Sequence, residues 1–195
     1  MSDSARPERW RLFVAAPLPA AAAQALWAAL DALRRAHPDA RWTRPEQLHL
    51  TLVFLGATEP ARVPDIQAAV GATAASQAPF AVSTGEPDGR LDDRRGGVAW
   101  LRLSEGRREI ARLSRRLDRA IGSGVYARSA PRPHVTVARG VDARLLADLA
   151  GAGPDLRFGW RVERAVLYRS FTGPAGSTYE ALADAPLGFG LERER

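Results

Sequence analysis

Two short segments of this sequence repeat the same order of residue types. Leu48 to Gly56 reads LHLTLVFLG and Pro133 to Gly140 reads PHVTVARG, so each places a histidine, an apolar residue, a threonine and another apolar residue in succession. The histidines, His49 and His134, are two of only three in the 195 residues. Chance does not readily repeat such a phrase in a histidine-poor chain, and the repeat therefore marks candidates for chemistry.

The repeated triplets place polar side chains on one face of a β-strand. Residues i and i+2 of a strand share a face, so His49 should project with Thr51 and His134 with Thr136. The apolar residues of both segments then point to the opposite face, where helices can cover them. If the two open faces meet across a cleft, two imidazoles and two hydroxyls converge on one point.

This set of groups suits the cleavage of a phosphodiester. Histidine titrates near neutral pH, so one imidazole can remove a proton from water while the other donates a proton to the leaving oxygen. The threonine hydroxyls can donate hydrogen bonds to phosphoryl oxygens as charge develops on them. The arrangement requires neither a metal nor a cofactor. Because the repeat is symmetric, the residues alone do not distinguish the acid from the base.

Composition excludes several other chemistries. The chain has no cysteine, which removes thiolate nucleophiles, disulfides and cysteine-based metal sites. All 28 basic residues are arginines, so a Schiff-base lysine and a P-loop lysine are excluded, and the net charge of +6 is compatible with an anionic partner. No signal peptide or membrane span is evident, so we expect a monomeric, cytoplasmic protein with no membrane partner.

The hydrophobic pattern predicts a mixture of helices and strands in a single domain covering residues 1–195, since no linker divides the chain. Residues 41–47 are expected to form a polar connection and residues 88–97 a hairpin loop. Strands are expected at 11–16, 48–55, 80–84, 98–103, 134–138, 161–171 and 178–183, and helices at 20–36, 60–75, 107–121 and 142–150.

The paired motifs make the sequence resemble the two-histidine (2H) phosphoesterase superfamily, specifically its RNA 2′,3′-cyclic phosphodiesterase branch, also called the 2′-5′ RNA ligase family. The matching segments are 11–19, 41–56, 133–139 and 167–182, which together span nearly the whole chain. The resemblance implies a bilobal α+β fold. In it, two antiparallel β-sheets face a central cleft, helices lie on the outer faces, and a pseudo-two-fold axis relates the halves.

The resemblance also implies an activity, namely metal-independent opening of a 2′,3′-cyclic phosphate, at an RNA 3′ end or on a nucleotide, to leave a 2′-phosphate. It assigns His49 to protonate the departing 3′ oxygen and His134 to activate water. It places Arg139 near the phosphate or the terminal nucleoside, with Thr51 and Thr136 also binding substrate. The motifs are further flanked by arginines that could contact RNA phosphates, namely Arg41, Arg44, Arg128 and Arg132.

The offset of Arg139 sets a structural condition. Arg139 lies five residues after His134, and an odd offset places it on the opposite face of a regular strand, so its role requires the strand to end or bulge by Ala138. Phe54 has the same offset from His49 and is expected in the core.

Three other interpretations remain open at this stage. The same histidines could join RNA ends through a 2′-5′ linkage, the substrate could be a small molecule such as ADP-ribose cyclic phosphate, or the chain could be a non-catalytic module that binds RNA ends. Outside the motifs, we expect His37 to be a solvated helix-terminal residue and the arginine-rich helix at 107–119 to present a solvated face. The loose G-x-G-x-x-A at 122–127 lacks a strand before it and does not predict dinucleotide binding.

Overall fold

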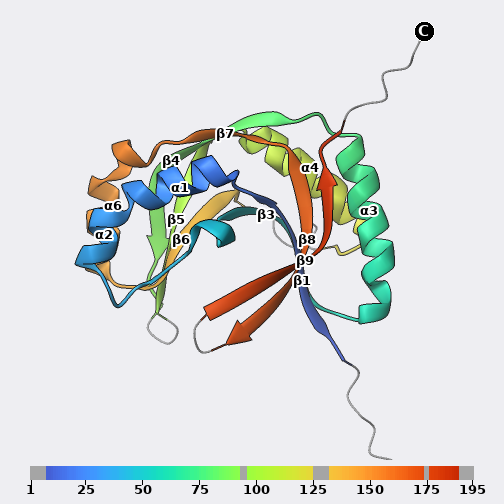
Figure 1. The fold of residues 1–195 in the computed structure, drawn as a ribbon, viewed down its shortest axis with the longest axis horizontal. Helices are drawn as coiled ribbons and strands as arrows, with labels where there is room; N and C mark the ends of the chain where they lie inside the picture. Colours follow the sequence, from blue (N-terminus) through green and yellow to red (C-terminus); the bar gives the residue numbers. More distant parts are fainter. Residues whose placement is uncertain (1–7, 93–95, 125–131, 174–175, 189–195) are drawn as a thin grey trace, which may run out of the picture.

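The computed structural model describes residues 8–92, 96–124, 132–173 and 176–188, which fold into helices and one antiparallel sheet (Figure 1). This confirms the expected α+β class. The strands are β1 (Trp10–Pro17), β2 (Arg41–Trp42), β3 (His49–Thr58), β4 (Phe80–Arg90), β5 (Gly97–Glu105), β6 (His134–Val141), β7 (Gly159–Val162), β8 (Arg164–Gly173) and β9 (Gly176–Pro186). The helices are α1 (Ala20–Ala29), α2 (Asp31–Ala36), α3 (Val63–Ala75), α4 (Arg107–Ile121) and α6 (Ala143–Gly151), with 3-10 turns η1 (Pro45–Gln47), η2 (Pro60–Arg62) and η3 (Gly153–Leu156).

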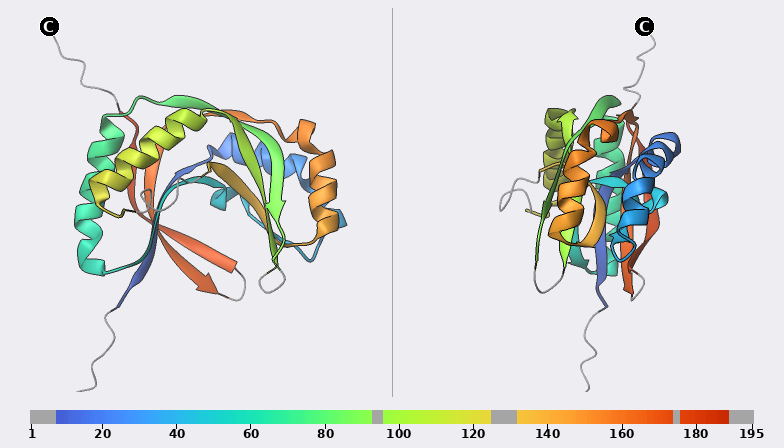
Figure 2. Two further views of the ribbon diagram at one scale, coloured as in Figure 1. Left: turned by 180° about the vertical axis from the view of Figure 1, so that it is seen from behind. Right: turned by 90° about the vertical axis from the view of Figure 1, so that its left-hand side faces the viewer.

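The described strands form one curled sheet in the order β7-β4-β5-β6-β3-β1-β8-β9, with β2 paired to β6. Helices α3 and α4 lie side by side, α3 against β8 and β9 and α4 against β3, whereas α6 packs on β4 and contacts α2 (Figures 1 and 2). Both motif strands, β3 and β6, are therefore central. Their buried apolar side chains belong to one continuous core.

The two expected sheets are the two halves of this single sheet. Strands β3 and β6 are joined through only one residue pair, Leu50 with Val135, and both side chains are fully buried. The sequence pattern could not show this join because it depends on how far the two strands run side by side.

Each motif strand carries a bulge at the third residue after its histidine. Leu52 has no partner in β1, since Thr51 pairs with Ala15 and Val53 already pairs with Val14. The corresponding interruption in β6 leaves Val137 without a partner in β5. A bulge inserts one residue into a strand and reverses the alternation of side chains beyond it. Val53 and Phe54 in β3, and Ala138 and Arg139 in β6, therefore lie on the faces that a regular strand would not give them. Second interruptions, at Leu55 and at Gly140, then restore the original alternation.

The helix predicted at 20–36 is wrong as a single element. Its backbone breaks at Leu30, where ψ is −1°, and the chain continues as a second, shorter helix. Leu30 is nearly fully buried. By contrast, the helix at 107–121 has the expected bounds and ends at Gly122, whose φ of 71° favours glycine.

Several strand boundaries also differ from the prediction. Residues 88–90, expected in a loop, extend β4 by pairing with β5, since a strand with one open face accepts polar side chains. Residues 41–42, expected in a connection, pair with β6 as β2. The single strand expected at 161–171 is two strands that separate at Glu163, because β7 pairs with β4 in one half of the sheet and β8 with β1 in the other.

The seam between β3 and β6 should be sensitive to loss of packing. Leu50→Ala removes buried methyl groups at the only residue pair joining these strands, so we expect the free energy of unfolding to fall by about 2–5 kcal/mol. Urea unfolding followed by circular dichroism measures this change. Leu91→Ala is the matched control, because Leu91 is 49% exposed and its truncation should change the free energy by no more than about 0.5 kcal/mol. Equal effects of the two substitutions would contradict the assignment.

Candidate active site

His49 and His134 begin their strands and are held by the same backbone contact. The Nδ1 of His49 lies 2.6 Å from the carbonyl oxygen of Gln47, and the Nδ1 of His134 lies 2.7 Å from that of Arg132. A carbonyl oxygen only accepts hydrogen bonds, so each Nδ1 carries the hydrogen and donates it. The Nε2 atom of each ring is then the atom that can exchange a proton with a substrate.

Aromatic rings from two other strands lie against His49, and a ring from a third strand packs behind them. Its ring centroid lies 5.2 Å from that of Phe13 on β1 and 5.6 Å from that of Tyr179 on β9, the latter edge-on at 86°. Tyr168 on β8 stacks on Phe13 at 5.2 Å. Gln47, whose carbonyl orients His49, also donates a side-chain hydrogen bond of 2.6 Å to the carbonyl oxygen of Ser177. The orientation of His49 therefore depends on β9, whose Ser177 lies 130 residues after Gln47 in the chain.

His134 has a more open environment. The ring of Trp100, on β5, lies 5.5 Å from the His134 ring. Arg102 pairs with His134 in register, and its guanidinium donates two hydrogen bonds to Asp88, from Nε at 2.8 Å and from Nη2 at 2.5 Å. These neighbours were not predicted, since the sequence does not reveal that β5 pairs with β6.

Burial lowers the pKa of His49 below the ordinary histidine value. Desolvation is the largest cause, the hydrogen bond to the Gln47 carbonyl partly opposes it, and the positive charges of His134 and Arg139 lower the pKa further. The free protein therefore holds His49 neutral at pH 7. The two charges that act on His49 come from the other motif, which places both motifs within electrostatic reach of one another.

The bulges decide which side chains accompany the histidines. Thr51 and Thr136 are half-buried and share the face of their histidines, as expected from the i, i+2 spacing. Arg139 lies beyond the bulge at Val137 and is exposed. Its predicted role required the strand to end or bulge by Ala138, and this bulge meets that requirement. The same reversal makes the prediction for Phe54 wrong: it is 43% exposed.

The exposed ring of Phe54 is covered in part by an arginine. The guanidinium carbon of Arg11, on β1, lies 4.6 Å from the ring centroid, within the range of a cation–π contact. Phe54 therefore adds an aromatic surface to the histidine face. Predicting the exposure of Phe54 from the sequence would have required predicting the bulge at Leu52, and no residue type there indicates a bulge.

The arginines that flank the two motifs differ in their positions and contacts. Arg41 pairs in register with Arg139, so both guanidinium groups belong to the β2–β6 edge, and Arg44 precedes η1. Arg132 contributes the carbonyl that orients His134. Arg128 lies outside the described residues, as do parts of the segments at 122–127 and 167–182.

His37 is not solvated, contrary to the prediction. It does follow the end of α2, but it is only 9% exposed, and its Nε2 lies 2.8 Å from Oδ2 of Asp148 on α6. The prediction failed because helix ends are usually exposed, whereas this one packs under another helix.

The histidines occupy an open face of the sheet. Two cavities among the described residues, of about 400 and 240 Å³, are lined by α3 with α4 and by β4 with α6, and neither histidine is among their lining residues. Within those same residues, no cluster of three or more histidine, aspartate or glutamate side chains is placed to hold a metal ion. Nor does any helix there have the length and hydrophobicity to cross a membrane.

Comparison with known proteins identifies the family to which this chain belongs. Residues 22–173 match the model of the 2′-5′ RNA ligase superfamily. An RNA 2′,3′-cyclic phosphodiesterase of Geobacillus stearothermophilus is 28% identical over 138 residues, which are 68% of this chain but only 42% of that protein. The chain therefore spans less than half the length of this curated relative.

Two solved structures have the same fold over most of their length. TT0787 of Thermus thermophilus matches with a TM-score of 0.66 and 28% identity, covering 91% of this chain and 97% of its own. LigT of E. coli, solved with ATP, matches with a TM-score of 0.68 and 22% identity, covering 93% and 99%.

The family model covers residues 22–173, which is most of the sequence, so the chain belongs to the 2′-5′ RNA ligase superfamily. The two solved structures share its fold.

The pKa of His49 provides a direct test of this electrostatic arrangement. In an NMR titration, the His49 ring should lose its proton below pH 6.5, the ordinary value. His134→Ala and Arg139→Ala should each raise the midpoint, because each removes a positive charge that disfavours protonation of His49. Arg102→Ala is the control, since Arg102 is paired with Asp88. A midpoint that stays fixed in both test variants would show that the motifs do not interact.

Proposed function

We propose that this protein hydrolyses 2′,3′-cyclic phosphates, at RNA 3′ ends or on nucleotides, to 2′-phosphates without a metal ion. The observation that carries the proposal is the matched pair of histidines. Both rings are held through Nδ1 by the carbonyl two residues earlier, and each leaves Nε2 to exchange protons. The 28% identical relative named RNA 2′,3′-cyclic phosphodiesterase supports the same substrate class.

In the proposed reaction, His134 Nε2 accepts a proton from a water molecule as the water oxygen attacks phosphorus. The bond between phosphorus and the 3′ oxygen breaks, and the 3′ oxygen takes a proton from His49 Nε2. The products are a 2′-phosphate and a free 3′-hydroxyl. Exchange of one proton between solvent and each histidine restores the starting state, and general acid–base catalysis of this kind typically contributes about 10²–10⁴ in rate.

Three further side chains are proposed to bind the phosphate. The hydroxyls of Thr51 and Thr136 share faces with the histidines and can donate to the non-bridging oxygens, on which charge increases in the transition state. Arg139 is exposed and close enough to lower the pKa of His49, so its guanidinium can pair with the same anion.

The acid role of His49 requires that substrate binding change its protonation. In the free protein the lowered pKa keeps His49 neutral, a state that cannot donate a proton. A bound phosphate anion would offset the charge of Arg139 and stabilise the protonated imidazole. We therefore propose that His49 takes up its proton together with the substrate.

Removal of either histidine should abolish most of the activity. With a short RNA ending in a 2′,3′-cyclic phosphate, assayed in EDTA, His49→Ala and His134→Ala should each lower kcat by about 10²–10⁴, because each removes a proton-transfer group. The product isomer is identified by chromatography against 2′- and 3′-phosphate standards. The third histidine supplies the control: folded His37→Asn should retain activity, since His37 pairs with Asp148 away from both motifs.

Full activity in either motif variant would contradict the proposal, as would an absolute requirement for added metal. The same assay, supplemented with RNA bearing a 5′-hydroxyl end, separates hydrolysis from 2′-5′ joining, because joining yields a longer strand. If folded wild-type protein binds the RNA without converting it or nucleotide 2′,3′-cyclic phosphates, the chain is an RNA-end-binding module.

The threonine hydroxyls should matter for the rate. Thr51→Val and Thr136→Val keep the shape of the side chain but remove the donor, so each should lower kcat by about 10². Thr→Ser at the same positions keeps the donor and should recover most of the rate. Unchanged kcat in the valine variants would assign both threonines to packing alone.

A further inference from the structure

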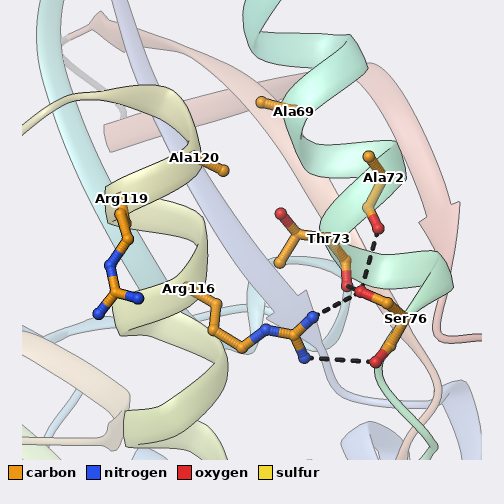
Figure 3. A pocket seen from close by; sticks show the side chains of 7 residues that line it. All are labelled: Ala69, Ala72, Thr73, Ser76, Arg116, Arg119 and Ala120. Atoms are coloured by element: carbon orange, nitrogen blue, oxygen red, sulfur yellow. Dashed lines mark hydrogen bonds between the residues drawn. The ribbon is translucent and has the colours of Figure 1, made fainter.

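A second site of positive charge lies on the far side of the strand that carries His49. Helices α3 and α4 lie side by side there, and α4 packs on β3 (Figure 2). Between them is an open groove of about 400 Å³. Its α3 wall consists of small residues and hydroxyls, among them Thr73 and Ser76. Arg116 and Arg119 line it from α4, and of the two Arg116 extends toward α3 (Figure 3).

Arg116 is fixed in the groove by hydrogen bonds. It reaches from α4 to the end of α3, where its guanidinium donates to the carbonyl and hydroxyl oxygens of Ser76 (Figure 3). It also donates to Oε1 of Gln77. All three acceptors are uncharged, so its positive charge is not neutralised. An arginine held by neutral acceptors is preorganised to contact an anion, because less side-chain entropy is lost on binding.

The rest of α4 extends this charge along the groove. The helix contains six arginines and two acidic residues, a net charge of +4. Among the described residues, no carboxylate forms an ion pair with any of the six. Exposed arginines at helical spacing lie on the surface beside the groove: Arg108, Arg112, Arg115 and Arg119.

The chemistry of this surface favours an extended polyanion. The large apolar side chains of α4 are all buried, and the large exposed hydrophobic residues of the described chain, Phe54, Leu91 and Phe171, lie on other elements. A membrane site would be expected to present apolar residues beside the charges, and a nucleotide-base site would present an aromatic ring. Guanidinium groups alternating with hydroxyls and small residues instead suit a sugar–phosphate backbone.

We propose that the groove between α3 and α4, with the arginine face of α4, binds the phosphate backbone of an RNA strand independently of sequence. This inference rests on the proposed function in its choice of RNA, and it adds a contact region separate from the histidine face. Long RNA would then bind more tightly than a mononucleotide, although both present the same cyclic phosphate to the histidines.

The test measures binding of a fluorescein-labelled, 20-nucleotide RNA with a 3′-hydroxyl end, so it does not depend on turnover. The variant Arg116→Ala/Arg119→Ala should weaken binding on the order of tenfold. It should also reduce the slope of log affinity against log salt by about 1.4, since each phosphate contact to a single strand contributes about 0.7. Hydrolysis of a nucleotide 2′,3′-cyclic phosphate should be unchanged.

Two controls keep the outcome interpretable. Arg35→Ala/Arg144→Ala removes the same charge from exposed positions on α2 and α6 and should leave RNA affinity nearly unchanged. Because Arg116 also joins the two helices, Arg119→Glu tests the groove without breaking a hydrogen bond and should weaken binding as well. Equal losses in both double variants, or full affinity in Arg119→Glu, would overturn the proposal. So would RNA binding that is abolished only by His49→Ala or Arg139→Ala.

Discussion

A β-strand alternates its side chains between two faces, and the whole site depends on where β3 and β6 interrupt that alternation. Before each bulge, a histidine and a threonine face outward while leucine or valine enters the core. After it, Val53 and Ala138 are buried and Phe54 and Arg139 are exposed. Two adjacent residues of each strand are thus buried in the core. The outward-facing residues are therefore two positions apart before the bulge and three positions apart across it. Without the bulges, the arginine would lie among the helices.

The two histidines share an anchor but differ in their surroundings. Each is oriented through Nδ1 by a backbone carbonyl, so the orientation of the reactive nitrogen depends on main-chain geometry. His49 is enclosed by Phe13 and Tyr179, whereas His134 lies beside Trp100 on a more open part of the sheet. A symmetric sequence motif therefore yields two electrostatically unequal groups, because packing around them is not symmetric. In the free protein this inequality favours the neutral form of His49, so its proposed acid role depends on a change of protonation when substrate binds.

The sequence was sufficient for the α+β class, the helix at 107–121, and the shared faces of the histidines and threonines, because all three follow from local periodicity. It was insufficient wherever strand pairing decided the outcome. The enclosure of His49 depends on β9, and the pairing of Arg102 with His134 depends on β5. Phe54 and His37 were misassigned for a related reason: a bulge exposes the first, and a helix distant in sequence buries the second. Local pattern specifies the face of a side chain only as long as the strand stays regular.

The single residue pair between β3 and β6 has a mechanical consequence. Elsewhere the sheet is held by ladders of several consecutive partners, as between β1 and β3 or β8 and β9, but Leu50 and Val135 form the whole backbone connection between the motif strands. Resistance to shear at this line therefore comes mainly from the interlocked core beneath it. His49 and His134 flank this line, each adjacent to one member of the pair. The separation of the two imidazoles is therefore set by the side chains that pack beneath β3 and β6, and only to a small extent by backbone hydrogen bonds between these strands.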